Sequence, residues 1–251
     1  MEKLLDSVMT LGEQMLKSGG EVHRVEDSIK RIFFSYGAEK TDVFIITSSM
    51  VVTVHTAGGE ILTQTRRIVD TSTDFEKLHQ LNELSRNICE NKFSIEKINK
   101  RLRAISDSKK YPLVFEFICY SLIACAFTLF FGGTVNDAAV SFVIGAIVRL
   151  TVFICDKTIS NKIFVRFVSS LCTTLFAFLA LKMNLIGTVD KVIIGNIMTL
   201  IPGIGLTNAL KDLFVGDSIA GLLRTIESCI IAVAIAAGYF TIALIMGGAI
   251  V

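Results

Sequence analysis

The most informative segment of the chain reads Asn196-Ile-Met-Thr-Leu-Ile-Pro-Gly-Ile-Gly-Leu-Thr-Asn-Ala-Leu-Lys-Asp212. It begins as an apolar run, is interrupted at Pro202-Gly203 and Gly205, and continues with Asn208 and Asp212 on a second run. A lipid-facing helix has no reason to break, because backbone groups freed in hydrocarbon cost several kcal/mol each. Transporters place such broken helices at substrate sites. The segment therefore favours a role in transport.

The composition around this segment divides the chain into two parts. Only eight of the 25 Lys and Arg residues and seven of the 23 Asp and Glu residues lie after Tyr111. The first part is thus an ordinary charged soluble domain, and the second a membrane domain, with boundaries expected at residues 1–109 and 110–251. A net charge of +2 gives no reason to expect a nucleic-acid partner.

Cysteine and histidine show no pattern that holds a metal. The six Cys residues have no CxxC spacing, and five of them lie in or beside apolar runs, where Cys acts as a small hydrophobe. The three His residues are scattered. We therefore expect no metal site and no cofactor. Charged residues through positions 1–19 argue against a cleavable signal peptide.

The soluble part predicts an α+β domain of pattern ααβββαα. Apolar residues recur at helical spacing over residues 4–19 and 22–36, where Gly19-Gly20 and Gly37 end the helices. Residues 42–48, 50–56 and 61–69 are rich in Val, Ile and Thr and read as strands, the last two joined by a hairpin turn. Thr73 with Glu76 reads as a capping box, and Ser94 caps a final helix over 95–105.

Five ionisable side chains crowd the start of the second helix: Glu21, His23, Arg24, Glu26 and Asp27. In one interpretation they complement the helix dipole and form surface ion pairs. In the other they form a ligand-sensing or interdomain patch, because positions three and four apart share a helix face. No nucleophile elbow or metal motif accompanies the Glu–His pair, so we do not expect an enzyme.

The membrane part predicts an all-α bundle of about five helices. The apolar runs cover residues 113–131, 138–154, 164–181, 192–206 and 226–250. A straight span needs about 20 residues. The fourth run is short, as expected of a helix broken at Pro202-Gly203. Lys and Arg residues gather before the first run, after the second and after the break, which predicts a cytoplasmic N-terminus and an outside C-terminus.

Several polar side chains lie in or beside these runs, and each has two interpretations. Arg149 either snorkels to the interface or serves function. Asn136 and Asp137 either cap a helix or face a pathway. Asn196 and Thr199, three apart in the fourth run, either join helices or contact substrate.

Asn208 and Asp212 continue that polar line past the break, and here we favour function. The helix start after the break presents free N–H groups and a positive dipole end, which suit a carboxylate. Carbonyls freed before Pro202 suit an ammonium group or a cation. Asp212 would carry a proton if burial raises its pKa.

These motifs resemble those of the threonine/serine exporter (ThrE) family. The resemblance rests on Gly20-Glu-Val-His-Arg-Val-Glu26, the strands around 43–55, Arg66-Arg67-Ile68, and Pro202-Gly203 with Asn208, Asp212, Gly216-Asp217 and Gly221. It implies an exporter in the bacterial inner membrane with a cytoplasmic N-terminal domain, and adds Asp217 to the pathway residues. Full-length members carry two membrane halves. This chain is similar to a YjjP-like split member with one half, whose partner is a small multi-span YjjB-like membrane subunit.

The leading hypothesis is a multi-pass subunit in the lipid bilayer that exports a small carboxylate substrate, threonine and serine or succinate-like dicarboxylates. The alternative is a membrane-anchored sensor or regulator that binds ligand in its soluble domain. Homo-oligomerisation is left open by the sequence.

Overall fold

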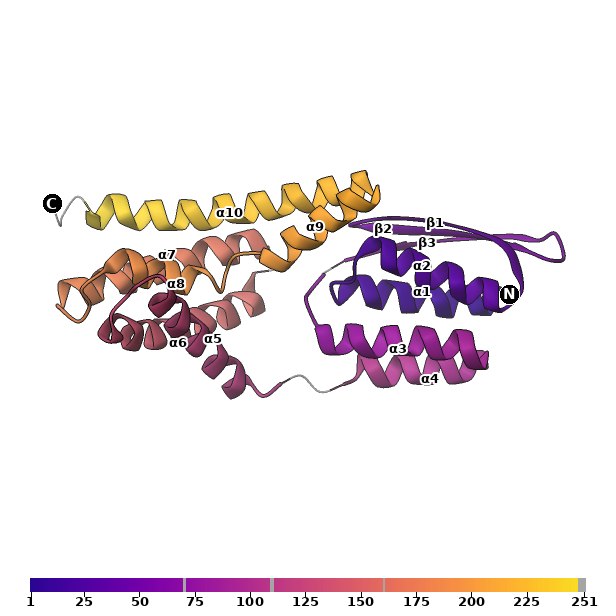
Figure 1. Ribbon diagram of the computed structural model, residues 1–251, viewed down its shortest axis with the longest axis horizontal. Coiled ribbons are helices and arrows are strands. Elements are labelled where there is room, and N and C mark those ends of the chain that lie inside the picture. The colour runs from indigo at the N-terminus through magenta and orange to yellow at the C-terminus, as the bar shows by residue number, and fades with distance from the viewer. Residues whose placement is uncertain (70, 109–110, 160, 248–251) are drawn as a thin grey trace. The chain divides into compact units, whose positions relative to one another are not determined.

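The computed structural model describes residues 1–69, 71–108, 111–159 and 161–247 (Figure 1). The chain forms two compact units, which we describe separately. The first contains the described residues up to 108 together with Ile204–Thr225, and the second contains the described residues from 111 to Gly203 and those from Ile226 onward. The predicted domain boundary at Lys109 and Lys110 and the predicted end of the last apolar run at Ile250 lie outside the described residues.

The first unit has the element order predicted from the sequence. In chain order it contains α1 (Glu2–Lys17), α2 (Val22–Ser35), β1 (Ala38–Ile46), β2 (Ser49–Thr56), β3 (Ile61–Arg67), α3 (Phe75–Asn91) and α4 (Ile95–Ser106). The N-terminal three-stranded sheet with helices is thus confirmed. The first strand starts at Ala38, earlier than the predicted residue 42, because Ala38 pairs with Thr56 at the far end of β2. Ladder pairing with β2 extends this strand beyond its apolar alternation.

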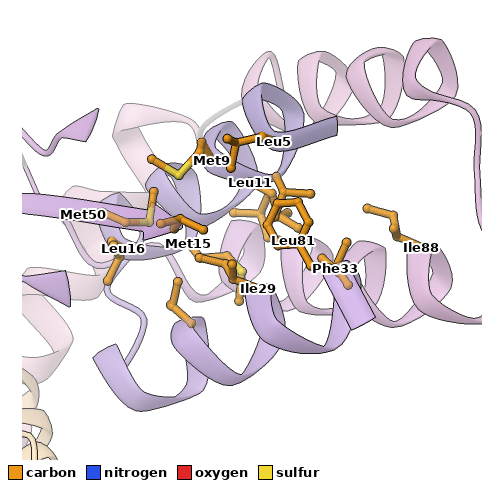
Figure 2. Packing of buried hydrophobic residues seen from close by; sticks show 14 of the residues in the cluster. Leu5, Met9, Leu11, Met15, Leu16, Ile29, Phe33, Met50, Leu81 and Ile88 are labelled. Carbon is orange, nitrogen blue, oxygen red and sulfur yellow. The ribbon is translucent and has the colours of Figure 1, made fainter. Parts of the chain in front are cut away.

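The sheet is antiparallel, with β2 between β1 and β3. Met50, Val52 and Val54 alternate along β2 and are fully buried, so one face of the sheet packs on the helices. Figure 2 shows the core beneath that face, where side chains of α1, α2, α3 and β2 meet: Leu5, Met9, Leu11, Met15, Leu16, Ile29, Phe33, Met50, Leu81 and Ile88. Burial of each such side chain contributes about 1.5–3 kcal/mol to the free energy of folding. This core therefore fixes the positions of the turns that connect its helices and strands.

The predicted capping box at Thr73 is wrong by one residue. Helix α3 begins at Phe75, and the Asp74 carboxylate accepts the hydrogen bond from the Lys77 N–H at 3.0 Å. An Asp cap binds the N–H three residues on, and for Asp74 that residue is Lys77. The cap predicted at Ser94 is confirmed, since its hydroxyl accepts from the Lys97 N–H at 3.4 Å.

The C-terminal part contains apolar helices, as predicted. Among the described residues, four helices are long and apolar enough to cross a membrane: α5 (Leu113–Phe130), α6 (Val135–Thr158), α7 (Lys162–Lys182) and α10 (Ser218–Gly247). The fourth apolar run of the sequence forms two shorter helices, α8 (Val189–Ile197) and α9 (Gly203–Val215). The interruption expected at Pro202-Gly203 occupies residues 198–202 between them.

Small residues bring the helices of the second unit into close contact. A Cβ added to Gly145 of α6 would lie 2.9 Å from the Ser121 Cα of α5. Gly195 of α8 approaches Thr128 of α5 still more closely. The Thr128 hydroxyl also donates to Ser141 Oγ at 2.7 Å. Helices in membranes associate through such small-residue contacts and interhelical hydrogen bonds, because lipid gives them no hydrophobic driving force.

Candidate functional site

The candidate site is built on the turn that ends α1. Gly19 has a φ of +91°, and its N–H donates to Leu16 O, while the Gly20 N–H donates to Met15 O. This pair of bonds is the Schellman motif, in which a residue in the left-handed region closes the helix. Glycine adopts that conformation without strain, which is why Gly19 stands there. The motif leaves the carbonyls of Gly19 and Gly20 available to other parts of the unit.

Side chains from α9 and the start of α10 bind these two carbonyls. Asn208 Nδ2 donates to Gly19 O at 3.2 Å, and Arg224 Nη2 donates to Gly20 O at 3.0 Å. Lys211 forms an ion pair with Glu21 at 2.9 Å. The segment that follows the helix break therefore packs on the α1–α2 turn within the first unit.

A buried ion pair lies at the centre of this contact. Arg224 Nη1 lies 3.0 Å from Asp212 Oδ2, and the Asp212 side chain is 1% exposed against 15% for Arg224. Burial raises the pKa of the Asp212 carboxyl above its ordinary value, and the positive charge of Arg224 opposes that rise. The Val22 N–H also favours the charged form, more weakly. Within the described part of the chain, Asp212 Oδ1 makes no hydrogen bond of good geometry.

A second carboxylate, Glu26, ties α2 to the sheet. Its Oε1 accepts the Ile45 N–H at 3.2 Å, and Lys30 lies 3.6 Å from Oε2. Burial raises the pKa of Glu26, Lys30 lowers it, and the negative charge of Asp217 raises it again. Asp217 Oδ2 is buried without a hydrogen-bond partner among the described residues. The negative charge of Asp217 thus raises the pKa of both Glu26 and Asp212, although Glu26 is far from it in the sequence.

The five residues of the predicted soluble-domain patch have different surroundings. Glu21 pairs with Lys211, and Glu26 is half-buried against β1. Asp27 makes a surface pair with Arg31 at 2.7 Å, and His23 is exposed. Arg24 lines a cavity of about 170 Å³ together with Glu21, the Gly19-Gly20 turn and Asn208.

The predicted pathway residues fall into both units. Asn208, Asp212, Asp217 and Gly205 belong to the first unit, whereas Asn136, Asp137, Arg149, Asn196, Thr199, Pro202 and Gly203 belong to the second. Asn196 is fully buried: its Nδ2 donates to Val192 O at 2.9 Å, and its Oδ1 has no partner among the described residues. Thr199 donates to Asn196 O at 2.8 Å. Two further charged residues of the second unit, Arg149 and Asp137, have local partners.

Arg149 is one of these, because its guanidinium binds the Glu116 carboxylate of α5, with the Nε contact at 2.8 Å. Asp137 is another. Its Oδ2 accepts from the Thr134 N–H and its Oδ1 from the Gly187 N–H, so it completes a capping box and holds the loop before α8. Asn136 is exposed. These contacts give Arg149 and Asp137 a structural role, and their role in a pathway stays a prediction.

Sequence reasoning missed three participants of the site. The sequence predicts for Lys211 and Arg224, the cations after the break, only a role in orientation, and for Gly19-Gly20 only a helix end and part of a family motif. The contacts join residues up to 204 positions apart, as in the bond from Arg224 to Gly20, and no local periodicity encodes them. A usable signal was the glycine pair itself, since a Schellman turn exposes carbonyls that need donors.

Comparison with known proteins agrees with the sequence motifs. Residues 6–246 match the model of the ThrE family, described as "Putative threonine/serine exporter". No curated protein and no solved structure gives a significant match. The family match covers both compact units, including α9 and the Asp212–Arg224 pair.

Proposed function

The chain belongs to the threonine/serine exporter family, and from this premise we propose that it is a subunit of a secondary exporter of small carboxylate-bearing metabolites. The substrates are threonine and serine, or succinate-like dicarboxylates. The match over residues 6–246 carries the proposal, and four helices long and apolar enough to span a bilayer support it. The membrane is the bacterial inner membrane, with the N-terminus cytoplasmic and the C-terminus outside.

A second small membrane subunit of the YjjB-like kind completes the transporter. Helices α8 and α9 have 9 and 13 residues, and a span needs about 20. Backbone groups at the interruption need partners inside a membrane, since none is supplied by lipid. Ile201 and Ile204 beside the interruption are exposed apolar residues. A partner subunit that covers this segment would meet both needs.

The substrate pathway uses the polar groups of α8 and α9. Asn196 keeps a buried amide oxygen without a partner among the described residues, which suits a donor on the substrate such as an ammonium group. The start of α9 carries the positive end of the helix dipole, which favours a carboxylate. Asp212 is the candidate proton carrier, because burial raises its pKa.

The test is an export assay in bacteria that express the chain with its partner subunit. Export predicts a lower intracellular level of threonine, serine or succinate than in cells with either subunit alone. Asp212→Asn should abolish the effect at an unchanged amount of protein in the membrane. The matched control is Asp27→Asn, which removes an exposed carboxylate of the first unit and should export normally. Normal export by Asp212→Asn would remove Asp212 from the mechanism.

The alternative is a membrane-anchored sensor, and the cavity beside Arg24 and Glu21 is the observation that favours it. The same assay separates the two functions. A sensor would leave the intracellular metabolite levels unchanged when both subunits are present.

A further inference from the structure

The cavity in the first unit lies at the turn between α1 and α2. Its volume of about 170 Å³ is enclosed by the Gly19-Gly20 turn, the first residues of α2, and side chains of α3 and α9. One water molecule needs about 10–15 Å³, and pockets that bind drug-sized ligands have about 300–1,000 Å³. The cavity therefore has room for a metabolite with a few non-hydrogen atoms and excludes a nucleotide.

Two side chains of opposite charge line this cavity. Arg24 forms no ion pair or hydrogen bond through its guanidinium within the described part of the chain, so its donors are available. A guanidinium matches the two oxygens of a carboxylate with parallel hydrogen bonds. Glu21 stands three positions before Arg24. Its Oε1 accepts from Lys211 at 2.9 Å, and its second oxygen can accept from an ammonium group.

Two amides and four apolar side chains, Met15, Val25, Phe75 and Leu78, complete the lining. Asn82 Nδ2 donates to Leu78 O at 2.7 Å, and Asn208 Nδ2 donates to Gly19 O. These bonds orient both side chains, and the amide oxygens are acceptors for a hydroxyl group of a ligand. Phe75 and Leu78 supply apolar contact. Such a lining, mostly fixed with a few convergent polar groups, is typical of small-molecule sites.

We infer that this cavity binds a small amino-acid zwitterion, with its α-carboxylate on Arg24 and its ammonium group at Glu21. A dicarboxylate fits less well, because Glu21 would repel its second carboxylate. The inference goes beyond export, since Arg24 and Glu21 are not residues of the predicted membrane pathway, which shares only Asn208 with the described lining of the cavity. Its occupant would touch Asn208 on α9, the helix that follows the interruption. Binding would therefore report the cytoplasmic amino-acid level to that helix.

The experiment is a calorimetric titration of the full chain in lipid nanodiscs with L-threonine, without a partner subunit. Saturable binding is expected, and Arg24→Gln should weaken it at least tenfold. The matched control is Arg31→Gln, on the same helix, whose guanidinium pairs with Asp27 and does not line the cavity. It should bind threonine as the wild type does. L-threonine methyl ester, which lacks the carboxylate charge, should bind the wild type at least tenfold more weakly.

Absence of saturable threonine binding would overturn the inference, as would equal binding by Arg24→Gln and the wild type. Equal binding of threonine and its methyl ester would do the same without any variant. Tighter binding of succinate than of threonine would contradict the role of Glu21. The titration measures ligand binding and not transport across the membrane. A negative titration therefore does not contradict the export proposal, and a negative export assay does not contradict the binding site.

Discussion

Removal of the Asp212 carboxylate is the sharpest perturbation that the structure offers. In Asp212→Ala, the guanidinium of Arg224 stays charged at any accessible pH and loses its partner in a nearly buried position. Breaking a buried pair in this way costs about 3–5 kcal/mol. Arg224 is 15% exposed and keeps its bond to Gly20 O, which places the expected loss near the lower end, at about 3 kcal/mol.

The reverse substitution should do less. In Arg224→Met, the remaining Asp212 carboxylate can take up a proton, because burial already raises its pKa and the opposing charge of Arg224 is gone. The double variant Asp212→Leu with Arg224→Met replaces the pair by apolar groups and should recover most of the loss. The expected order of stability is wild type and double variant first, then Arg224→Met, then Asp212→Ala.

Hydrogen exchange of the full chain in nanodiscs measures this locally. Loss of about 3 kcal/mol from the contact corresponds to exchange on the order of a hundredfold faster in peptides from residues 204–225. Peptides from β2, in the core of the same unit, serve as the internal reference. Exchange of Asp212→Ala within about threefold of the wild type, a change of under about 1 kcal/mol, would refute the reasoning. So would a double variant whose effects simply add.

Three further predictions test other parts of the structure. The pKa of Glu26 is raised in the folded state, so the folded chain binds more protons than the unfolded chain at pH values above the ordinary pKa of the group, and the free energy of unfolding should fall as pH rises through that window. Glu26→Gln should make this slope smaller in melting scans between about pH 4 and about pH 7, and Asp212, whose pKa is also raised, should supply the slope that stays. Gly145→Val should reduce the free energy of unfolding by about 1–3 kcal/mol or more, because its side chain would collide with α5, and so lower the melting temperature in detergent. The control Gly187→Ala, with no atom within 4 Å of its new Cβ, should melt like the wild type. Thr134→Ala should lose about 1 kcal/mol with the capping box, seen as faster exchange at the start of α6.

The element order of the first unit was predictable because its signals are local. Apolar residues of α1 such as Leu4, Val8 and Leu11 recur with the helical period and are all buried. Turn chemistry at Gly19 and Gly37, both with positive φ, marks where helices end. The error at Thr73 is also local: two adjacent cap residues compete, and the geometry of a single turn decides between them.

The long-range part of the site was not predictable by the same reasoning. Asn208 and Asp212 were singled out because polar residues in an apolar context need partners, and that argument is sound. This argument does not identify the partner. Every residue has a backbone carbonyl, so nothing in the sequence marks Gly19 O as the acceptor for Asn208. Arg149 and Asp137 also have partners that the sequence does not identify. Arg149 binds Glu116 and Asp137 binds the Gly187 N–H, both within the second unit.

The Gly19-Gly20 turn connects the α9 contact with the cavity, because its residues take part in both. Its carbonyls accept from Asn208 of α9 and Arg224 of α10, so the two residues whose N–H groups end α1 bind these helices through their carbonyls. The cavity shares Gly19, Gly20 and Asn208 with this contact. A ligand there can shift the position of α9 only by its difference in affinity for the two arrangements. Because Asn208 both lines the cavity and binds Gly19 O, a movement of α9 away from the turn would remove part of the ligand-binding surface. The ligand would then bind the two arrangements with different affinities. A tenfold difference in affinity amounts to about 1.4 kcal/mol, comparable to one hydrogen bond of the contact.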